Sequence, residues 1–339
     1  MGLGFVGRKS ISDYMVQAPN TLEEPAEVET QESDIERRRS LVPAELHGQR
    51  LDKAVVAFVP EFSRNHLQGL IEGGHVQVDG RVIDTASRRV SAGQVLEVEL
   101  VPTAESRAFV AEALPLRIVF EDEHLLVVDK AAGMVVHPAA GNWSGTLLNA
   151  LLAHHRGAAS LPRAGIVHRL DKDTSGLMVV GKTLAAATAL VRSIAAREVH
   201  REYQAIAHGR VVASKFSVDA PIGRDPQSRV RMAVLASGKP ARTDVQVLAR
   251  GDATSALRCV LHTGRTHQIR VHLASRGHPL VADVIYGGRP ALGMQRQALH
   301  AARLEFAHPI LAEPLMFEAE APVDFALAWQ RVADDRDAS

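Results

Sequence analysis

The sequence has one cysteine, few aromatic residues and no long apolar run. Cys259 alone cannot form an intramolecular disulfide or a cysteine-based zinc cluster. Aromatic residues make up 4% of the 339 residues, against 46% for hydrophobic residues as a whole, so the core must be largely aliphatic. No apolar stretch is long enough to cross a bilayer, and the first residues lack the apolar segment of a signal peptide. We therefore expect a soluble, cytoplasmic protein without a membrane partner.

An excess of charge of one sign is also missing, but the balance is uneven along the chain. The 39 lysines and arginines equal the 39 aspartates and glutamates in number. Residues 156–303, however, combine 23 basic with 9 acidic residues and hold eight of the 16 histidines. Acids would be interleaved with the basic residues on an ordinary solvated face, and here they are scarce. The pattern favours a polyanion as partner.

Motifs for metal, hydrolase and nucleotide chemistry are missing or misleading. No H-E-x-x-H or G-x-S-x-G pattern occurs, and His267 and His272 are five residues apart, off a common helical face. Residues 176–183 match the P-loop pattern G-x-x-x-x-G-K-[ST], but the intervening LMVV favours a strand and a polar turn precedes it. We expect no metal site, and we treat nucleotide hydrolysis as a weak alternative.

The segment HRLDKDTSGL, residues 168–177, sets a carboxylate among cations between two apolar stretches. Asp171 lies between Arg169 and Lys172. An ionised carboxylate can act as a nucleophile without a metal, and a nearby guanidinium would keep it charged when a substrate excludes water. Asp171 is therefore the candidate nucleophile, and Asp173, two residues further on, is its rival.

The first third of the chain divides into an extension and a small module. Residues 1–43 are polar and acidic and are expected to be a disordered extension, and residues 334–339 a flexible tail. Apolar spacing in residues 44–102 predicts two helices against a small sheet. The expected elements are helices over 49–60 and 64–74, the second capped by Ser63, a hairpin over 75–83 turning at Asp79-Gly80, and a strand over 90–100.

Residues 103–115 are the expected linker to a large domain over 116–333. Runs of strands with intermittent helices favour an α+β fold with a mixed, largely antiparallel sheet and flanking helices. The expected strands cover 116–120, 125–129, 133–136, 177–182, 201–209, 230–235, 241–250 and 256–262. The expected helices cover 146–155, 183–198 and 266–278, the last closed by Gly277.

The order of residues in the small module resembles the S4 RNA-binding domain. The resemblance rests on RLD at residue 50, SR at residue 63, VDG at residue 78 and the final LEV. Residues 44–101 hold 6 basic and 8 acidic residues, so contact with RNA would have to come from a local patch. Arg50, Lys53, Arg64 and His66 are the candidates for that patch. A purely structural appendage is the alternative.

Several strings of the large domain, in the same order, are similar to signatures of the RluA/RluD family of RNA pseudouridine synthases. They are AGIVHRLDKDTSGLMVVGKT, REYQAIAHG, GKPARTDVQVL, LHTGRTHQIRVHLASRGHPLVAD and RQALHAARLEFAHPI. The strings VVHPAAGN, TLLNALL and YGGRP bring the match closest to the branch that modifies large-subunit (23S) ribosomal RNA. The resemblance implies an isomerisation in which uracil leaves its ribose, turns and rejoins it through C5. Because this reaction is redox-neutral and loses no atoms, we expect no cofactor.

The resemblance also assigns roles to individual residues. Asp171 matches the aspartate that attacks the nucleoside, at the sugar or at the uracil ring, and Arg270 matches the basic residue that pairs with it. Tyr203 matches the tyrosine that stacks on the uracil and is suited to removing the C5 proton. Arg169 matches an arginine inserted where the flipped base has left the stack. Lys172, Arg265 and His267 are further candidates for RNA contact.

The expected substrate is the loop of helix 69 in 23S ribosomal RNA, in free RNA or in a ribosomal subunit precursor. We expect a monomer without an obligate protein partner. Two alternatives stay open at this point. The same chemistry could act on another ribosomal or transfer RNA site, or the chain could be a non-catalytic RNA-binding factor in ribosome assembly.

Overall fold

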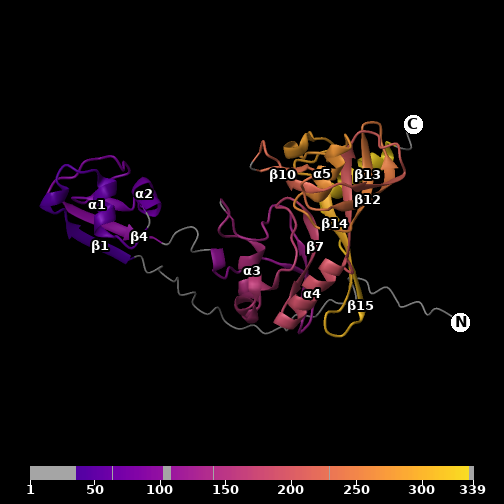
Figure 1. Cartoon of the computed structure of the whole chain (residues 1–339), viewed down its shortest axis with the longest axis horizontal. Coiled ribbons are helices and arrows are strands. Elements are labelled where there is room, and N and C mark those ends of the chain that lie inside the picture. Colours follow the sequence, from indigo (N-terminus) through magenta and orange to yellow (C-terminus); the bar gives the residue numbers. More distant parts are fainter. Residues whose placement is uncertain (1–35, 63, 102–107, 140, 229, 336–339) are drawn as a thin grey trace, which may run out of the picture. The chain divides into compact units, whose positions relative to one another are not determined.

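The computed structural model describes residues 36–62, 64–101, 108–139, 141–228 and 230–335. They form two compact units, a smaller one within residues 36–101 and a larger one within residues 108–335 (Figure 1). Each unit has a hydrophobic core of its own. Within the described ranges, every helix is too short or too polar to cross a bilayer.

The smaller unit packs two helices on a four-stranded sheet with the order β1-β4-β2-β3, in which all pairs are antiparallel. Leu51 and Leu67, one from each helix, are almost fully buried, as the helical spacing predicts. Asp79 and Gly80 have positive φ angles of 52° and 75°, which the predicted two-residue hairpin requires. The elements are β1 (Glu36–Leu41), η2 (Ala44–Leu46), α1 (Leu51–Phe58), α2 (Arg64–Glu72), β2 (Val76–Val78), β3 (Arg81–Val82) and β4 (Val95–Leu100).

Strand β1 corrects the predicted extent of the N-terminal extension. Residues 36–41 pair along their whole length with β4, so they are not disordered. Arg37 forms an ion pair with Glu99 of β4 at 2.6 Å, and Arg38 pairs with Glu61. A charge run that suggested a solvated tail is thus complementary to acids of the sheet and of the loop after α1, and the module begins at residue 36 rather than 44. Residues 1–35 and the predicted cap Ser63 lie outside the described residues.

The larger unit is built on a nine-stranded mixed sheet, which confirms the predicted α+β class. The strand order is β5-β6-β7-β14-β8-β13-β12-β9, with β15 paired to β14, and only β7 and β14 run parallel. The strands are β5 (Arg117–Glu121), β6 (Leu125–Lys130), β7 (Ser175–Gly181), β8 (His200–His208), β9 (Lys215–Asp219), β12 (Arg242–Arg250), β13 (Thr254–Leu261), β14 (Leu299–Ala307) and β15 (Pro314–Glu318). A separate hairpin consists of β10 (Ile222–Arg224) and β11 (Met232–Val234).

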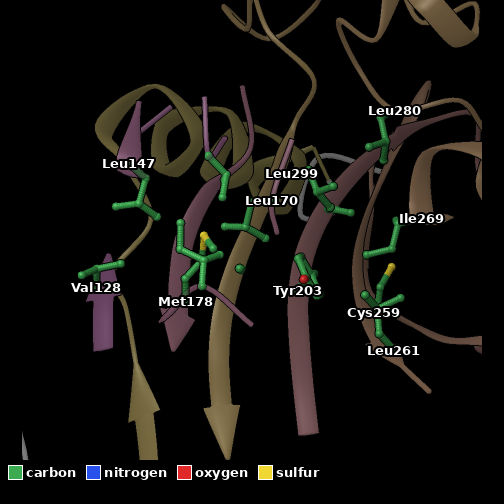
Figure 2. Close-up of a cluster of buried hydrophobic side chains, with 14 of the residues drawn as sticks. Val128, Leu147, Leu170, Met178, Tyr203, Cys259, Leu261, Ile269, Leu280 and Leu299 are labelled. Carbon is green, nitrogen blue, oxygen red and sulfur yellow. The ribbon is translucent and has the colours of Figure 1, made fainter. Parts of the chain in front are cut away.

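Helices lie on both faces of this sheet. The face that carries Met178 and Tyr203 packs against α3 and α5 in one hydrophobic cluster, part of which is drawn in Figure 2. The opposite face packs against α4 through Leu190 and against α6 through Phe325. The helices are α3 (Leu147–His154), α4 (Leu184–Ala196), α5 (Gln268–Ser275) and α6 (Val323–Asp334), with 3₁₀ turns η4 (Arg156–Ser160), η5 (Pro162–Gly165) and η6 (Val284–Tyr286).

One predicted strand of the larger unit is wrong. Residues 133–136 form no strand, although their composition is as apolar as that of β6. The carbonyls of Val135 and Val136 accept hydrogen bonds from the amides of Leu147 and Leu148, at 2.8 and 3.1 Å. Because the first amides of α3 have no partner within the helix, this segment supplies acceptors to the helix start instead of joining the sheet.

The linker and the tail are shorter than predicted. Ala108 is buried, and the side-chain nitrogen Nδ2 of Asn149 in α3 donates to the carbonyl of Val110 at 2.8 Å. The carboxylate of Glu112 accepts from the amide of Gly145 at 3.0 Å. Residues 108–115 therefore belong to the larger unit, and residues 102–107 lie outside the described residues. At the other end, α6 continues to Asp334, so that residue is helical rather than part of the tail.

Residues 176–183, which match the P-loop pattern, make contacts that stabilise the fold. A Cβ atom on Gly176 would lie 2.2 Å from the carbonyl oxygen of Ala301 in β14, and one on Gly181 would lie 2.6 Å from the amide of Ala187 in α4. Lys182 forms an ion pair with Glu121, and Thr183 caps α4 by accepting from the amide of Ala186. All four residues of LMVV are buried in β7. The segment has no phosphate-binding curl, as its strand-like composition indicates.

Candidate active site

An open pocket of about 530 Å³ lies beside the segment that contains Asp171. Its lining comes from the residues before β7, the start of β8, the end of α4 and the loop from β13 into α5. Among the described residues that line it, Asp171 is the only acid. Six arginines face it: Arg163, Arg169, Arg197, Arg201, Arg265 and Arg270. The pocket therefore combines one carboxylate with a strongly positive wall, which suits an anionic polymer.

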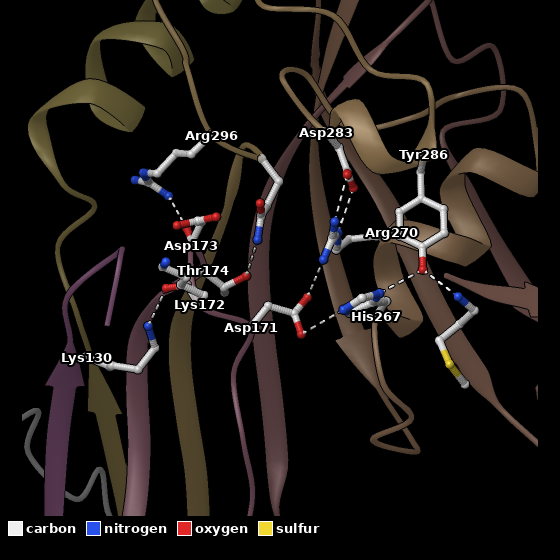
Figure 3. Close-up of polar contacts among 12 residues, drawn as sticks. Lys130, Asp171, Lys172, Asp173, Thr174, His267, Arg270, Asp283, Tyr286 and Arg296 are labelled. Carbon is white, nitrogen blue, oxygen red and sulfur yellow. Dashed lines mark hydrogen bonds and ion pairs between the residues drawn. The ribbon is translucent and has the colours of Figure 1, made fainter. Parts of the chain in front are cut away.

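The segment 171–174 is held from below by a buried ammonium group (Figure 3). Nζ of Lys130, at the end of β6, donates to the carbonyls of Ala131, Met134 and Lys172 at 2.8, 2.9 and 3.0 Å. Burial lowers the pKa of Lys130 to about 8, even though nearby aspartates favour its charge. Arg296 donates to the carbonyl of Asp173 at 2.9 Å. These bonds fix the backbone of Lys172 and Asp173, the two residues that follow Asp171. The carboxylate of Asp171 therefore projects from a rigid turn.

Asp171 receives a hydrogen bond from a buried guanidinium. Nη1 of Arg270 donates to Oδ2 of Asp171 at 3.0 Å, across 99 residues of sequence. On its other side, Arg270 makes a bidentate pair with Asp283, with Nε–Oδ2 and Nη2–Oδ1 distances of 2.7 and 2.8 Å. Burial disfavours the charge of Arg270, but Asp283 and Asp171 outweigh it and raise the pKa of the guanidinium. Arg270 thus stays charged in the interior and holds Asp171 in place, as predicted.

Two further side chains complete this network. The hydroxyl of Tyr286 accepts from the amide of Met232 at 2.9 Å and lies 2.7 Å from Nδ1 of His267. A hydroxyl that donates to Nδ1 leaves the N–H of Nε2 on the side of Asp171, 3.8 Å from Oδ1. Burial lowers the pKa of His267, consistent with this neutral form. His267 also has a φ of 57°, a conformation that is costly for residues other than glycine and is concentrated at functional sites.

The other predicted residues fall into two groups. Tyr203 in β8 lines the pocket and is 6% exposed, and burial raises the pKa of its phenol. Arg169 and Arg265 are exposed and also line the pocket. Lys172 is exposed but does not line it, and neither does the rival acid Asp173. The geometry therefore favours Asp171 over Asp173 as the reacting carboxylate.

The predicted basic patch of the smaller unit is organised by an acid. Asp52, which is 3% exposed, accepts from Nε of Arg50 at 3.0 Å and from Nη2 of Arg64 at 3.1 Å. Hydrogen bonding by Arg50, opposed by burial and assisted by Arg64, lowers the pKa of Asp52. Both guanidinium groups are largely exposed, and Lys53 lies beside them on α1 with its Nζ 3.5 Å from Gln49.

Sequence reasoning missed Asp283, Tyr286 and Asp52. The first two lie in the quoted strings PLVAD and YGG, but a single acid or tyrosine after an apolar run carries no local sign of its partner. Asp52 was visible beside Arg50, and its place at the second position of an amphipathic helix indicates that it faces the core side. Metal binding finds no support in the described ranges, where no three His, Cys, Asp or Glu side chains are grouped as ligands.

Comparison with known proteins agrees with this geometry. Residues 124–275 match the model of the family described as RNA pseudouridylate synthase, and residues 49–96 match that of the S4 domain. The chain is 48% identical over 299 residues to ribosomal large subunit pseudouridine synthase D of Nitrosomonas europaea, covering 86% of each protein. It is 48% identical over 320 residues to the protein of that name from Pseudomonas aeruginosa, covering 90% of this chain and 99% of the other.

A solved structure supports the same assignment. Human RNA pseudouridylate synthase domain containing 1 superimposes with a TM-score of 0.51 and 29% identity, over 66% of this chain and 86% of the human one. The family match covers Asp171, Tyr203 and Arg270, the residues that meet around the pocket. The chain therefore belongs to the RNA pseudouridine synthases of the RluA/RluD family, isomerases that act on uridine in RNA, and carries an S4 domain ahead of its catalytic unit.

Proposed function

We propose that this enzyme converts specific uridines of large-subunit ribosomal RNA to pseudouridine, with Asp171 as nucleophile and the loop of helix 69 as target. The observation that carries the proposal is the pairing of Asp171 with the buried Arg270 in a pocket that is otherwise basic. The relatives named ribosomal large subunit pseudouridine synthase D support the choice of RNA. Ribosomal RNA as substrate also favours the cytoplasm as the place of action.

The pocket residues suggest how the reaction proceeds. A uridine within a structured RNA must leave its stack to reach Asp171, and the exposed Arg169 at the pocket is positioned to enter the space it leaves. Asp171 forms a bond to the nucleoside, at C1′ or at the uracil ring, and the bond between C1′ and N1 breaks. The uracil turns while held against Tyr203 and a bond between C1′ and C5 forms, and the bond to Asp171 breaks so that the carboxylate is regenerated. The proton on C5 then leaves, and N1 gains one, so no atom is lost overall.

Each residue near Asp171 has a distinct part in this scheme. Arg270 keeps the carboxylate charged and oriented while substrate excludes water, because a hydrogen-bonded guanidinium favours the ionised form. Tyr203 provides a ring for the uracil and an oxygen for the C5 proton. Lys172, Arg265 and His267 are proposed to contact RNA around the entrance, and Arg50, Lys53 and Arg64 to contact RNA elsewhere on the substrate.

The test uses 23S ribosomal RNA that lacks pseudouridine and carries tritium at uracil C5, with no added cofactor. Formation of the C5 bond must release that tritium. We expect release by the wild type, none by Asp171→Asn, and release by Asp173→Asn, a matched control two residues away that does not line the pocket. Mapping the new pseudouridines then shows whether helix 69 is the target.

Three outcomes would change or refute the proposal. Release only from ribosomal subunits, and not from free RNA, would make the assembled particle the substrate. Pseudouridines outside helix 69 would keep the chemistry and change the target. If neither substrate released tritium, the proposal would fail in favour of a non-catalytic assembly factor.

A further inference from the structure

The catalytic pocket contains a second buried guanidinium that the reaction scheme does not use. Arg201 is the second residue of β8, two positions before Tyr203 and on the same face of the sheet. It is 6% exposed and lines the pocket. In the described ranges only Arg201 and Arg270 are buried arginines, and both belong to this pocket. Their surroundings differ sharply.

Arg270 is compensated by two carboxylates, whereas Arg201 has none. Among the residues that the structure describes, the guanidinium of Arg201 makes no hydrogen bond or ion pair, and its Nε is fully buried without an acceptor. Arg258 and Arg303 also leave Nε unpaired, but each forms an ion pair through a terminal nitrogen. A buried charge without a counterion destabilises a fold, so its retention calls for a ligand that supplies the missing anion.

The groups around Arg201 cannot supply that anion. Nε2 of His168 accepts from the amide of Val179 at 3.0 Å, so its proton is on Nδ1, which is buried without an acceptor. Burial and the charge of Arg201 lower the pKa of His168 to about 3, so this ring stays neutral. Nε2 of His137, another lining residue, is also buried without a hydrogen-bond partner among the described residues. This wall of the pocket therefore has donors in excess of acceptors.

A glycine keeps the guanidinium accessible from the pocket. A Cβ atom on Gly264, in the loop between β13 and α5, would lie 2.8 Å from Nη1 of Arg201. Any larger residue at this position would crowd the terminal nitrogens. The loop thus leaves open the place at which an anionic group could meet Arg201.

We propose that Arg201 binds a backbone phosphate of the nucleotide that enters the pocket. A phosphate is favoured over a uracil carbonyl because only an ionised group compensates the buried charge, and guanidinium and phosphate match in geometry. The proposal rests on RNA as the substrate of this pocket, but not on helix 69 as the target. It makes Arg201 a binding residue for the reacting nucleotide, next to the ring of Tyr203.

The test compares Arg201→Met, which keeps the aliphatic volume, with Arg201→Lys, which keeps the charge. Binding to unmodified 23S ribosomal RNA is measured between 50 and 300 mM salt, together with the melting temperature of each free protein. We expect Arg201→Met to bind about tenfold more weakly, and its slope of log K against log salt to be shallower by about 0.7 to 0.9, the contribution of one phosphate contact. Arg201→Lys should keep the wild-type slope.

The melting temperature separates this role from a structural one. Removing an uncompensated buried charge should leave the melting temperature of Arg201→Met unchanged or raise it, whereas loss of a structural contact would lower it. The matched control is Arg258→Gln, on the neighbouring strand β13 but on the opposite face of the sheet, which should leave binding unchanged. An unchanged salt slope for Arg201→Met, or a fall of its melting temperature by several degrees, would overturn the proposal. Binding is scored separately from tritium release, so an inactive wild type would refute the proposed reaction without deciding the role of Arg201.

Discussion

Both units of this enzyme contain ion pairs between arginine and aspartate, but the buried partner is the acid in one unit and the cation in the other. In the smaller unit the acid is inside, with the side chain of Asp52 4% exposed, while those of Arg50 and Arg64 are 47% and 64% exposed. In the larger unit the cation is inside, with the side chain of Arg270 4% exposed, and it presents Asp171, whose side chain is 16% exposed. The buried partner in each case fixes the exposed one. One unit thereby displays positive charge, and the other displays the carboxylate that we propose as nucleophile.

The difference shows why the net charge of a unit does not predict which charged groups it exposes. The smaller unit has more acids than bases in residues 44–101, yet one of these acids, Asp52, positions two arginines. The larger unit is rich in bases, yet one of its two buried arginines, Arg270, positions an acid. The function of a charged residue here depends on whether it is the buried support or the exposed group.

The largest effect is expected for a change that leaves both ion networks intact. Tyr203→Phe keeps the ring but removes the oxygen proposed to take the C5 proton, and loss of a general base lowers rates by about 100- to 10,000-fold. Because burial raises the pKa of Tyr203, phenolate is scarce at neutral pH, so the wild-type rate should rise with pH in the alkaline range. Single-turnover tritium release from pH 7 to 10 measures both the loss of rate in Tyr203→Phe and the pH dependence of the wild type. A Tyr203→Phe rate within a few-fold of the wild type would limit this residue to stacking.

The next largest effect is expected when the support of the active-site network is removed. Asp283→Asn leaves Arg270 with Asp171 as its only carboxylate partner, which should slow single-turnover tritium release about 100-fold and reduce the free energy of unfolding by about 3 kcal/mol. Asp324→Asn is the matched control, because Asp324 makes a similar bidentate pair with Arg296 but is partly exposed. Asp324→Asn should reduce the free energy of unfolding by less than about 1 kcal/mol. Equal effects of the two variants would contradict the importance of burial.

A smaller effect is expected for the equivalent change in the smaller unit. Asp52→Asn frees Arg50 and Arg64 without removing their charge, so affinity for RNA should fall only about two- to fivefold and the salt slope should stay the same. The rate at saturating RNA should not change. Filter binding over a salt series measures the effect, with the exposed acid of Asp84→Asn as control. If the double variant Arg50→Gln, Arg64→Gln kept the wild-type slope, these arginines would not contact phosphate.

The last effect is absent at neutral pH and concerns stability in acid. His168 stays neutral in the fold with a pKa of about 3, against about 6.5 in the unfolded chain, so only the unfolded state takes up its proton as the pH falls. Its contribution is complete above pH 6.5 and is lost toward pH 3, with a slope of about 1.4 kcal/mol per pH unit. His168→Gln, which can still accept from Val179, should flatten that slope in denaturant titrations. An unchanged slope in His168→Gln would contradict burial of this ring as its cause.

The parts of the fold that could be predicted are those with a strong local pattern. Asp171 was recognisable because its cations are neighbours in sequence. Strands β6 and β7 were recognisable from continuous apolar runs, and α4 from its long apolar sequence. The partner Asp283 was not, because it meets Arg270 through the fold and not through a charge pattern. Strand β1 was missed because its arginines match glutamates that are distant in sequence. Apolar content could not distinguish residues 133–136 from a strand, since their backbone is used to cap α3.

The contact between Asn149 and residues 108–110 determines how the protein can be divided. A catalytic fragment that begins at residue 116, the domain boundary that composition suggests, would lose the carbonyl of Val110, which accepts from the buried side-chain amide of Asn149. Asn149 also forms the capping box of α3 with Thr146, so the damage would reach that helix. The instability of such a fragment would wrongly suggest that catalysis needs the S4 domain. A fragment that begins at Ala108 keeps these bonds and allows the two units to be studied apart.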